Sequence, residues 1–155
     1  MFVYEFVVIL VMLFFNGLFA AYEMGLASIS RAHLTVLLNE KKMGAHDAIF
    51  MKDHMEGSLA VIQLGITLFG AIAAATGGAG VNDVFAPYLR SAWGTSDILS
   101  KSLAIIFFII PLTLTTITFA ELVPKMIALK NKEWIVLKLS PFMRMLSSFT
   151  YPVVS

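Results

Sequence analysis

The sequence contains no cysteine, so disulfide bonds and thiolate metal sites are excluded. It has three histidines, His33, His46 and His54, which is a poor basis for a zinc site. Charged residues make up 14% of the chain, against about 25% in an average soluble domain. The net charge is +1 and there is no basic run, so we expect no binding to nucleic acid. Nucleophile-elbow, phosphate-loop and histidine–metal motifs are also missing, and we expect no enzyme activity.

The chain contains three long stretches without charged residues. Hydrophobic residues make up 59% of it, and residues 6–22, 57–82 and 102–120 carry no charge at all. A membrane-spanning helix needs roughly 20 apolar residues, so each of the three windows is long enough. No basic residue precedes the first window, which favours a retained helix over a signal peptide. The sequence therefore predicts an all-α membrane protein that lies in a lipid bilayer.

We expect one domain, residues 1–155, with membrane spans at about 2–30, 57–76 and 102–122. Gly77, Gly78 and Gly80 are predicted to end the second helix and to leave a loop over 81–101. Residues 31–56 and 123–155 are predicted to form amphipathic juxtamembrane helices, broken near Gly44 and at Pro141. The last stretch, 142–155, is too short to be an independent fourth span.

The distribution of basic residues predicts the orientation of the spans. Positions 31–56 carry four Lys or Arg and the positions after 122 carry five, whereas 77–101 carry two. Basic residues beside spans favour the cytoplasmic side. We therefore expect the amino terminus outside the cell membrane and the carboxyl terminus in the cytoplasm.

Glu121 is the residue that the predicted spans are organised around. It ends the third charge-free window, and a carboxylate there is costly unless it is compensated. Glu23 ends the first window, and Asn16 lies on the same helical face as Glu23. Thr67 and Thr118 add hydroxyl oxygens. These are hard oxygen ligands, which suit Mg²⁺, Ca²⁺ or Na⁺.

A structural explanation for the same residues remains open. Glu121 is able to pair with Lys125 four residues later, and Glu23 is able to lie at the membrane interface. The threonine hydroxyls near Glu121 are able to bond back to the preceding helical turn.

Three segments resemble the signatures of the CNNM/CorC transmembrane domain. They are Asn16 to Glu23 (NGLFAAYE), Val61 to Leu68 (VIQLGITL) and Phe119 to Lys125 (FAELVPK). Their order and spacing also resemble the family, and the resemblance covers nearly the whole chain. The third segment is the most specific of the three.

The resemblance implies a homodimeric membrane protein that transports Mg²⁺, generally by export and coupled to Na⁺ in some members. It implies an ion site near Ala20, Gly65 to Thr67, Ala120 and Glu121. Family members often have serine near Ala20 and glycine at Ala120, so Ala20 is able to contribute only its backbone. The family usually continues into cytosolic CBS modules that bind ATP, which we expect in the full-length protein and not within these residues.

Two functions follow as hypotheses. The first is a divalent-cation transporter domain in which Glu121 is the principal ligand, Thr67 and Thr118 assist, and Glu23 and Asn16 shape the wall of the site. The second is a dimeric membrane anchor or regulator that moves no ion.

Overall fold

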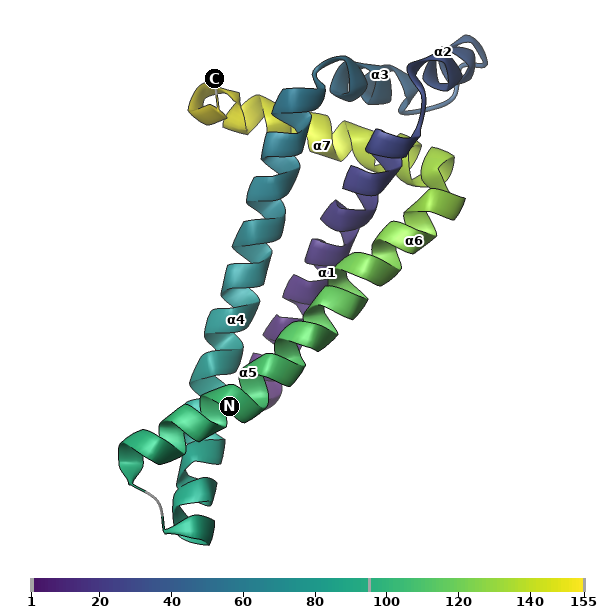
Figure 1. The fold of residues 1–155 in the computed structure, drawn as a ribbon. Coiled ribbons are helices and arrows are strands. Elements are labelled where there is room, and N and C mark those ends of the chain that lie inside the picture. Colours follow the sequence, from purple (N-terminus) through teal and green to yellow (C-terminus); the bar gives the residue numbers. More distant parts are fainter. Residues whose placement is uncertain (1, 95, 155) are drawn as a thin grey trace.

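A computed structural model describes residues 2–94 and 96–154, and every element in these ranges is a helix (Figure 1). Three helical stretches are long and apolar enough to cross a membrane: Val3–Ser28, Met55–Trp93 and Asp97–Lys130. The predicted class, an all-α protein with three membrane spans, is confirmed. The elements in order are α1 (Phe2–Ser28), α2 (Arg31–Asn39), α3 (Ala45–Asp53), α4 (Met55–Trp93), α5 (Asp97–Thr116), the π-helix η1 (Ile117–Leu122), α6 (Val123–Lys130) and α7 (Lys132–Val154).

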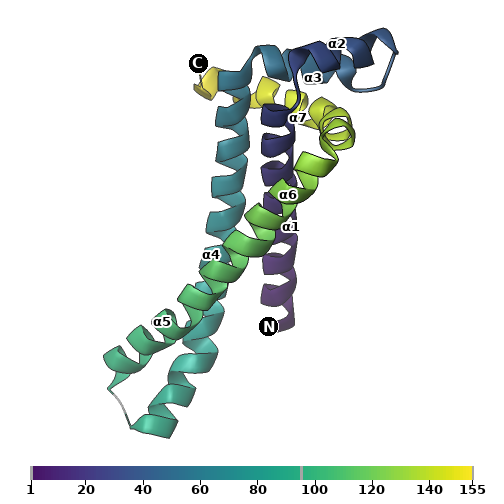
Figure 2. The ribbon, with the colours of Figure 1, turned by 45° about the vertical axis from the view of Figure 1, so that its right-hand side comes forward.

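Each of the three spans has one end on the side of the molecule where α2, α3 and α7 gather, and there the second and third spans stand apart from one another (Figure 1). There α7 lies across the end of the bundle and contacts α1, α3 and α4. The first two spans, α1 and α4, run side by side, and the third span runs obliquely from α4 to α7 (Figure 2). At the other end, α4 and α5 extend past the amino terminus of α1 (Figures 1 and 2).

The largest hydrophobic core lies at the end where the short helices gather, and many large apolar side chains on the rest of the spans are exposed. Phe107 and Phe14, for example, are 63% and 64% exposed. Large apolar side chains are exposed in such numbers when lipid is the solvent. The core consists of Phe19, Tyr22, Leu26, Ile29, Leu34, Leu37, Ala45, Ala48, Met51, Ile62, Val136 and Met143.

The second helix does not end at the glycines 77–80, and the predicted loop over 81–101 is wrong. The helix α4 runs on to Trp93 and ends at Gly94, whose φ is +59°. Two of these glycines serve close packing instead: a Cβ on Gly77 would lie 3.2 Å from Leu112 Cδ2, and one on Gly80 would lie 2.9 Å from Glu5 Oε2. In lipid the backbone has no water to bond, so an unbroken helix is favoured over a loop.

Two further boundaries differ from the prediction. The third span begins at Asp97 rather than near 102, because the Ser96 hydroxyl accepts a hydrogen bond from the Leu99 backbone N–H at 3.4 Å and caps the helix. The tail is one helix, α7, which continues through Pro141 where a break was expected. Its packing against α1, α3 and α4 outweighs the cost of the missing backbone hydrogen bond.

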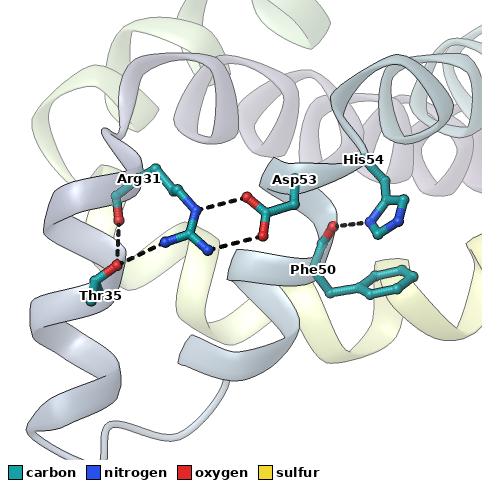
Figure 3. Close-up of polar contacts among 5 residues, drawn as sticks. All are labelled: Arg31, Thr35, Phe50, Asp53 and His54. Carbon is teal, nitrogen blue, oxygen red and sulfur yellow. Dashed lines mark hydrogen bonds and ion pairs between the residues drawn. The ribbon is translucent and has the colours of Figure 1, made fainter.

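The juxtamembrane segment folds as two short helices separated near Gly44, as predicted. Gly44 has a φ of +84° and precedes α3. An ion pair joins the two helices: the Arg31 guanidinium donates to both carboxylate oxygens of Asp53, at 2.8 and 3.1 Å (Figure 3). Arg31 also donates to the Thr35 hydroxyl at 3.2 Å, and this fixes the guanidinium on α2.

The Arg31–Asp53 pair predicts a pH dependence. The hydrogen bond from Arg31 holds the pKa of the Asp53 carboxyl below its ordinary value. The contribution of the pair is therefore present above the unfolded-state pKa of about 3.9 and is lost as the pH falls through the lower folded-state pKa. Thermal unfolding in detergent should show Asp53→Asn less stable than the wild type at pH 7. The two should converge in acid, and a difference that is independent of pH would contradict the pairing.

Candidate functional site

The π-helix η1 places the residues around Glu121. Its wide turn is closed by the Val123 backbone N–H, which donates to the Thr118 carbonyl five residues earlier. Pro124 follows at the start of α6 and has no N–H. Any other residue at position 124 would have a backbone N–H able to donate to the carbonyl of Phe119 or Ala120. With proline there, this turn lacks one backbone donor. Such a turn is a place where carbonyl oxygens are able to face a ligand.

Gly17 is the point at which α1 meets this turn. A Cβ on Gly17 would lie 3.2 Å from Pro124 Cγ and 3.7 Å from the Ala120 carbonyl oxygen. The Ala120 oxygen therefore faces α1, and Ala120 itself is buried. Only a glycine lets the first and third spans approach this closely without displacing Pro124.

Asn16, next to Gly17, carries a buried side-chain oxygen that the described helices leave without a partner. Its side chain is buried, with 2% of the residue exposed. Its Oδ1 has no hydrogen-bond partner among the residues that the structure describes. Its Nδ2 lies toward α4, 3.9 Å from where a Cβ on Gly70 would be. A buried polar atom without a partner costs about 1–3 kcal/mol, so a donor or a cation that reached Oδ1 would stabilise the protein.

The two candidate carboxylates have different surroundings. Glu23 forms an ion pair with Lys125, in which Oε2 lies 3.1 Å from Nζ, and both side chains are about three-quarters buried. Glu121 is half-buried and forms no ion pair or hydrogen bond within residues 2–94 and 96–154. The alternative pairing of Glu121 with Lys125 is therefore not formed. Within the same residues no group of three or more His, Cys, Asp or Glu side chains is close enough to hold a metal. An ion here would rely on carbonyl and amide oxygens besides one carboxylate.

The remaining predicted site residues do not present free side-chain ligands. Ala20 is fully buried, and Gly65 lies so close to α1 that a Cβ there would overlap the Phe19 ring. Thr67 is exposed on α4 and has no hydrogen bond in the described part of the chain. The Thr118 hydroxyl donates to the Leu114 carbonyl at 2.8 Å, which is the back-bonding that the sequence left open.

Three contacts near the site were not predicted from the sequence. They are the Glu23–Lys125 ion pair, the approach of Gly17 to Ala120 and the buried hydrogen bond between the Tyr22 hydroxyl and Ser140 Oγ at 2.8 Å. Gly17 and Lys125 lie within the first and third motifs, but spacing along one chain does not show which residue of another helix they meet. Ser140 carries no sequence signal.

A cavity adjoins these residues on the side of the amino terminus. It has a volume of ≈ 210 Å³ and lies between α1, α4 and the third span, with Gly70, Thr113 and Thr116 in its wall. The Thr116 hydroxyl bonds back to the Leu112 carbonyl at 2.8 Å. The cavity is mostly apolar, and Asn16 adjoins it through Gly70, which lies in its wall.

Two comparisons with known proteins each match most of the chain. Residues 7–155 match the family model described as the cyclin M transmembrane N-terminal domain. The chain is also 32% identical over 155 residues to the UPF0053 protein sll0260 of Synechocystis sp., and the alignment covers 94% of this chain and 32% of that relative. The chain thus spans about a third of the length of the curated relative it matches.

Proposed function

This chain belongs to the cyclin M (CNNM) family of transmembrane domains, and from that membership we propose that it is the membrane part of a divalent-cation transporter. The proposed cargo is Mg²⁺, moved out of the cytoplasm, with Na⁺ as the coupling ion. The observation that carries the proposal is the buried Asn16 oxygen without a partner, one residue from the place where the Ala120 carbonyl faces α1.

The charges near the site support a single hydrated cation. Lys125 compensates Glu23, which leaves Glu121 as the uncompensated carboxylate. Mg²⁺ keeps several waters and usually binds through one or two carboxylates with other oxygens. Glu121 would supply the charge, and the Ala120 carbonyl and the Asn16 amide would supply neutral oxygens. In a low-dielectric setting a carboxylate and a cation stabilise one another strongly.

The proposed orientation gives the ion its route. The end at which α2, α3 and α7 gather carries most of the basic residues, so we place it in the cytoplasm. The ion would reach Glu121 from that side and leave past the cavity near Gly70. We also propose that the protein is a homodimer whose full-length chain carries cytosolic CBS modules. Cysteine cross-linking along α4 and α5 tests the dimer.

Magnesium-dependent thermal stabilisation tests the site. A ligand at 100 times its Kd raises the free energy of unfolding by about 2.7 kcal/mol. The wild type should show a shift of this kind in Mg²⁺, and Glu121→Gln should show none, because the amide lacks the charge that the cation requires. The control is Glu40→Gln, which removes an exposed carboxylate at the end of α2 and should keep the shift. An unchanged shift in Glu121→Gln would exclude Glu121 as a ligand.

A flux assay separates transport from the alternative, a membrane anchor or regulator. Protein in liposomes should release Mg²⁺ faster than protein-free liposomes, and an opposing Na⁺ gradient should change the rate. Glu121→Gln should abolish the flux while cross-linked dimers persist. Wild-type protein that binds Mg²⁺ but gives no flux under either condition would favour the anchor.

A further inference from the structure

A basic pocket lies where α6 ends and α7 begins. It has a volume of ≈ 700 Å³, and its wall includes Lys42, Lys130, Lys132 and Lys138. The side-chain ammonium groups of these four lysines form no ion pair or hydrogen bond within the described ranges. The one carboxylate in the wall, Glu133, lies 3.2 Å from His33 Nε2 and is engaged there. Four lysines against one carboxylate leave the wall of the hollow with a net positive charge, which favours an anionic ligand.

An apolar groove continues from this pocket. It has a volume of ≈ 350 Å³, runs between α1, α6 and α7, and shares Trp134 and Lys138 with the basic pocket. Apart from Lys138 its wall is formed by nonpolar residues, among them Phe14, Phe119 and Ile127. A basic hollow joined to an apolar groove fits a molecule with an anionic head and a hydrocarbon tail.

The position relative to the spans identifies the kind of amphiphile. Lys130 is the last residue of the third span, so the pocket lies at the depth of the lipid headgroups. Trp134, at the junction of pocket and groove, is 64% exposed, and tryptophan favours the membrane–water interface. Basic pockets at this depth attract anionic headgroups. A soluble phosphate would fill the pocket but leave the groove without an occupant.

We infer that the pocket binds the phosphate headgroup of an anionic phospholipid, with one acyl chain in the adjoining groove. The groove also contains Gly17, Phe119 and Pro124, so the acyl chain lies against the turn that carries Ala120. The inference concerns lipid binding and does not depend on ion transport.

Tryptophan fluorescence provides the test, because the chain has two tryptophans and the other, Trp93, lies at the far end of α4. Trp93→Phe leaves Trp134 as the sole reporter. This protein is placed in phosphatidylcholine vesicles with rising fractions of dibrominated phosphatidylglycerol or of dibrominated phosphatidylcholine, without Mg²⁺. Quenching by the brominated phosphatidylglycerol should begin at clearly lower fractions. Adding Lys132→Gln and Lys138→Gln should reduce that preference about thirtyfold. Lys41→Gln, on the same turn as Lys42 but outside the pocket wall, should leave it unchanged.

Several results would overturn the inference. Equal quenching by the two lipids would show that the pocket does not select the headgroup. No quenching by either lipid would show that something else, such as a second copy of the chain, covers the groove. Relief of quenching by millimolar glycerol 3-phosphate would assign the pocket to a soluble phosphate. If the double variant kept its preference for phosphatidylglycerol, Lys132 and Lys138 would be excluded as headgroup ligands. Unchanged quenching of the double variant by brominated phosphatidylcholine would show that it is folded and inserted.

Discussion

Asn16→Leu is expected to keep or raise the free energy of unfolding while Mg²⁺-dependent stabilisation is lost. Leucine has the same branching and number of side-chain heavy atoms as asparagine, is bulkier and has no polar atom, so the substitution removes a buried oxygen that has no partner in the described structure. Removing such an atom relieves a desolvation penalty of about 1–3 kcal/mol. The same substitution deletes an oxygen proposed to face the cation. Stability and ion binding should therefore change in opposite directions.

Thermal unfolding with and without Mg²⁺, together with liposome flux, measures both effects. The control is Asn39→Leu, which removes an exposed amide at the end of α2 and should alter neither readout. If Asn16→Leu instead lowers stability in the absence of Mg²⁺, then Oδ1 is satisfied by a structural water or by a second subunit. The amide would then belong to packing and not to the ion site.

Gly44→Ala is expected to release α7 from the rest of the protein. Alanine at a φ of +84° is strained, and its Cβ would overlap the backbone carbonyl of Leu137 in α7. The strained backbone costs about 1–3 kcal/mol, and overpacking adds about 1–3 kcal/mol. The neighbouring atom is backbone, so it cannot rotate away. The unfolding temperature in detergent should fall accordingly, and the rate of amide hydrogen exchange in α7 should increase.

Gly94→Ala separates the two contributions. Gly94 also has a positive φ, +59°, but no atom lies within 4 Å of its Cβ position. It therefore carries the backbone strain without the overlap, and its loss of stability should be clearly smaller. Equal losses in the two variants would show that α7 does not pack on Gly44.

The spans were predictable from the sequence because lipid imposes a simple rule on charge. Three windows without charged residues located three membrane-crossing helices. The ends of the helices were not predictable in the same way. Gly77 and Gly80 indicated a loop, but in the structure they admit Leu112 and Glu5. Turn residues break helices in water, where the freed backbone bonds to solvent, and that option is missing in lipid.

The sequence predicted which types of residue lie near the candidate site, but it did not predict which residues on other helices they contact. Asn16 was expected to shape the wall of the site together with Glu23, and in the structure it is buried. Lys125 was read against Glu121, four residues away, but it pairs with Glu23 on another helix. Thr118 was expected to assist as a ligand, but its hydroxyl donates to the Leu114 carbonyl of its own helix. Contacts between helices depend on crossing angles, which the pattern of one chain does not contain.

The π-helix changes the direction in which the side chains of the third span point around the helix axis. An α-helix turns by about 100° per residue, and a π-turn takes up one residue more. The side chains after Leu122 are therefore rotated by about one residue from where an unbroken α-helix would place them. This allows α5 to pack against α4 while α6 packs against α1. A single span thereby presents different sides to two neighbours, and the rotation accounts for Lys125 meeting Glu23.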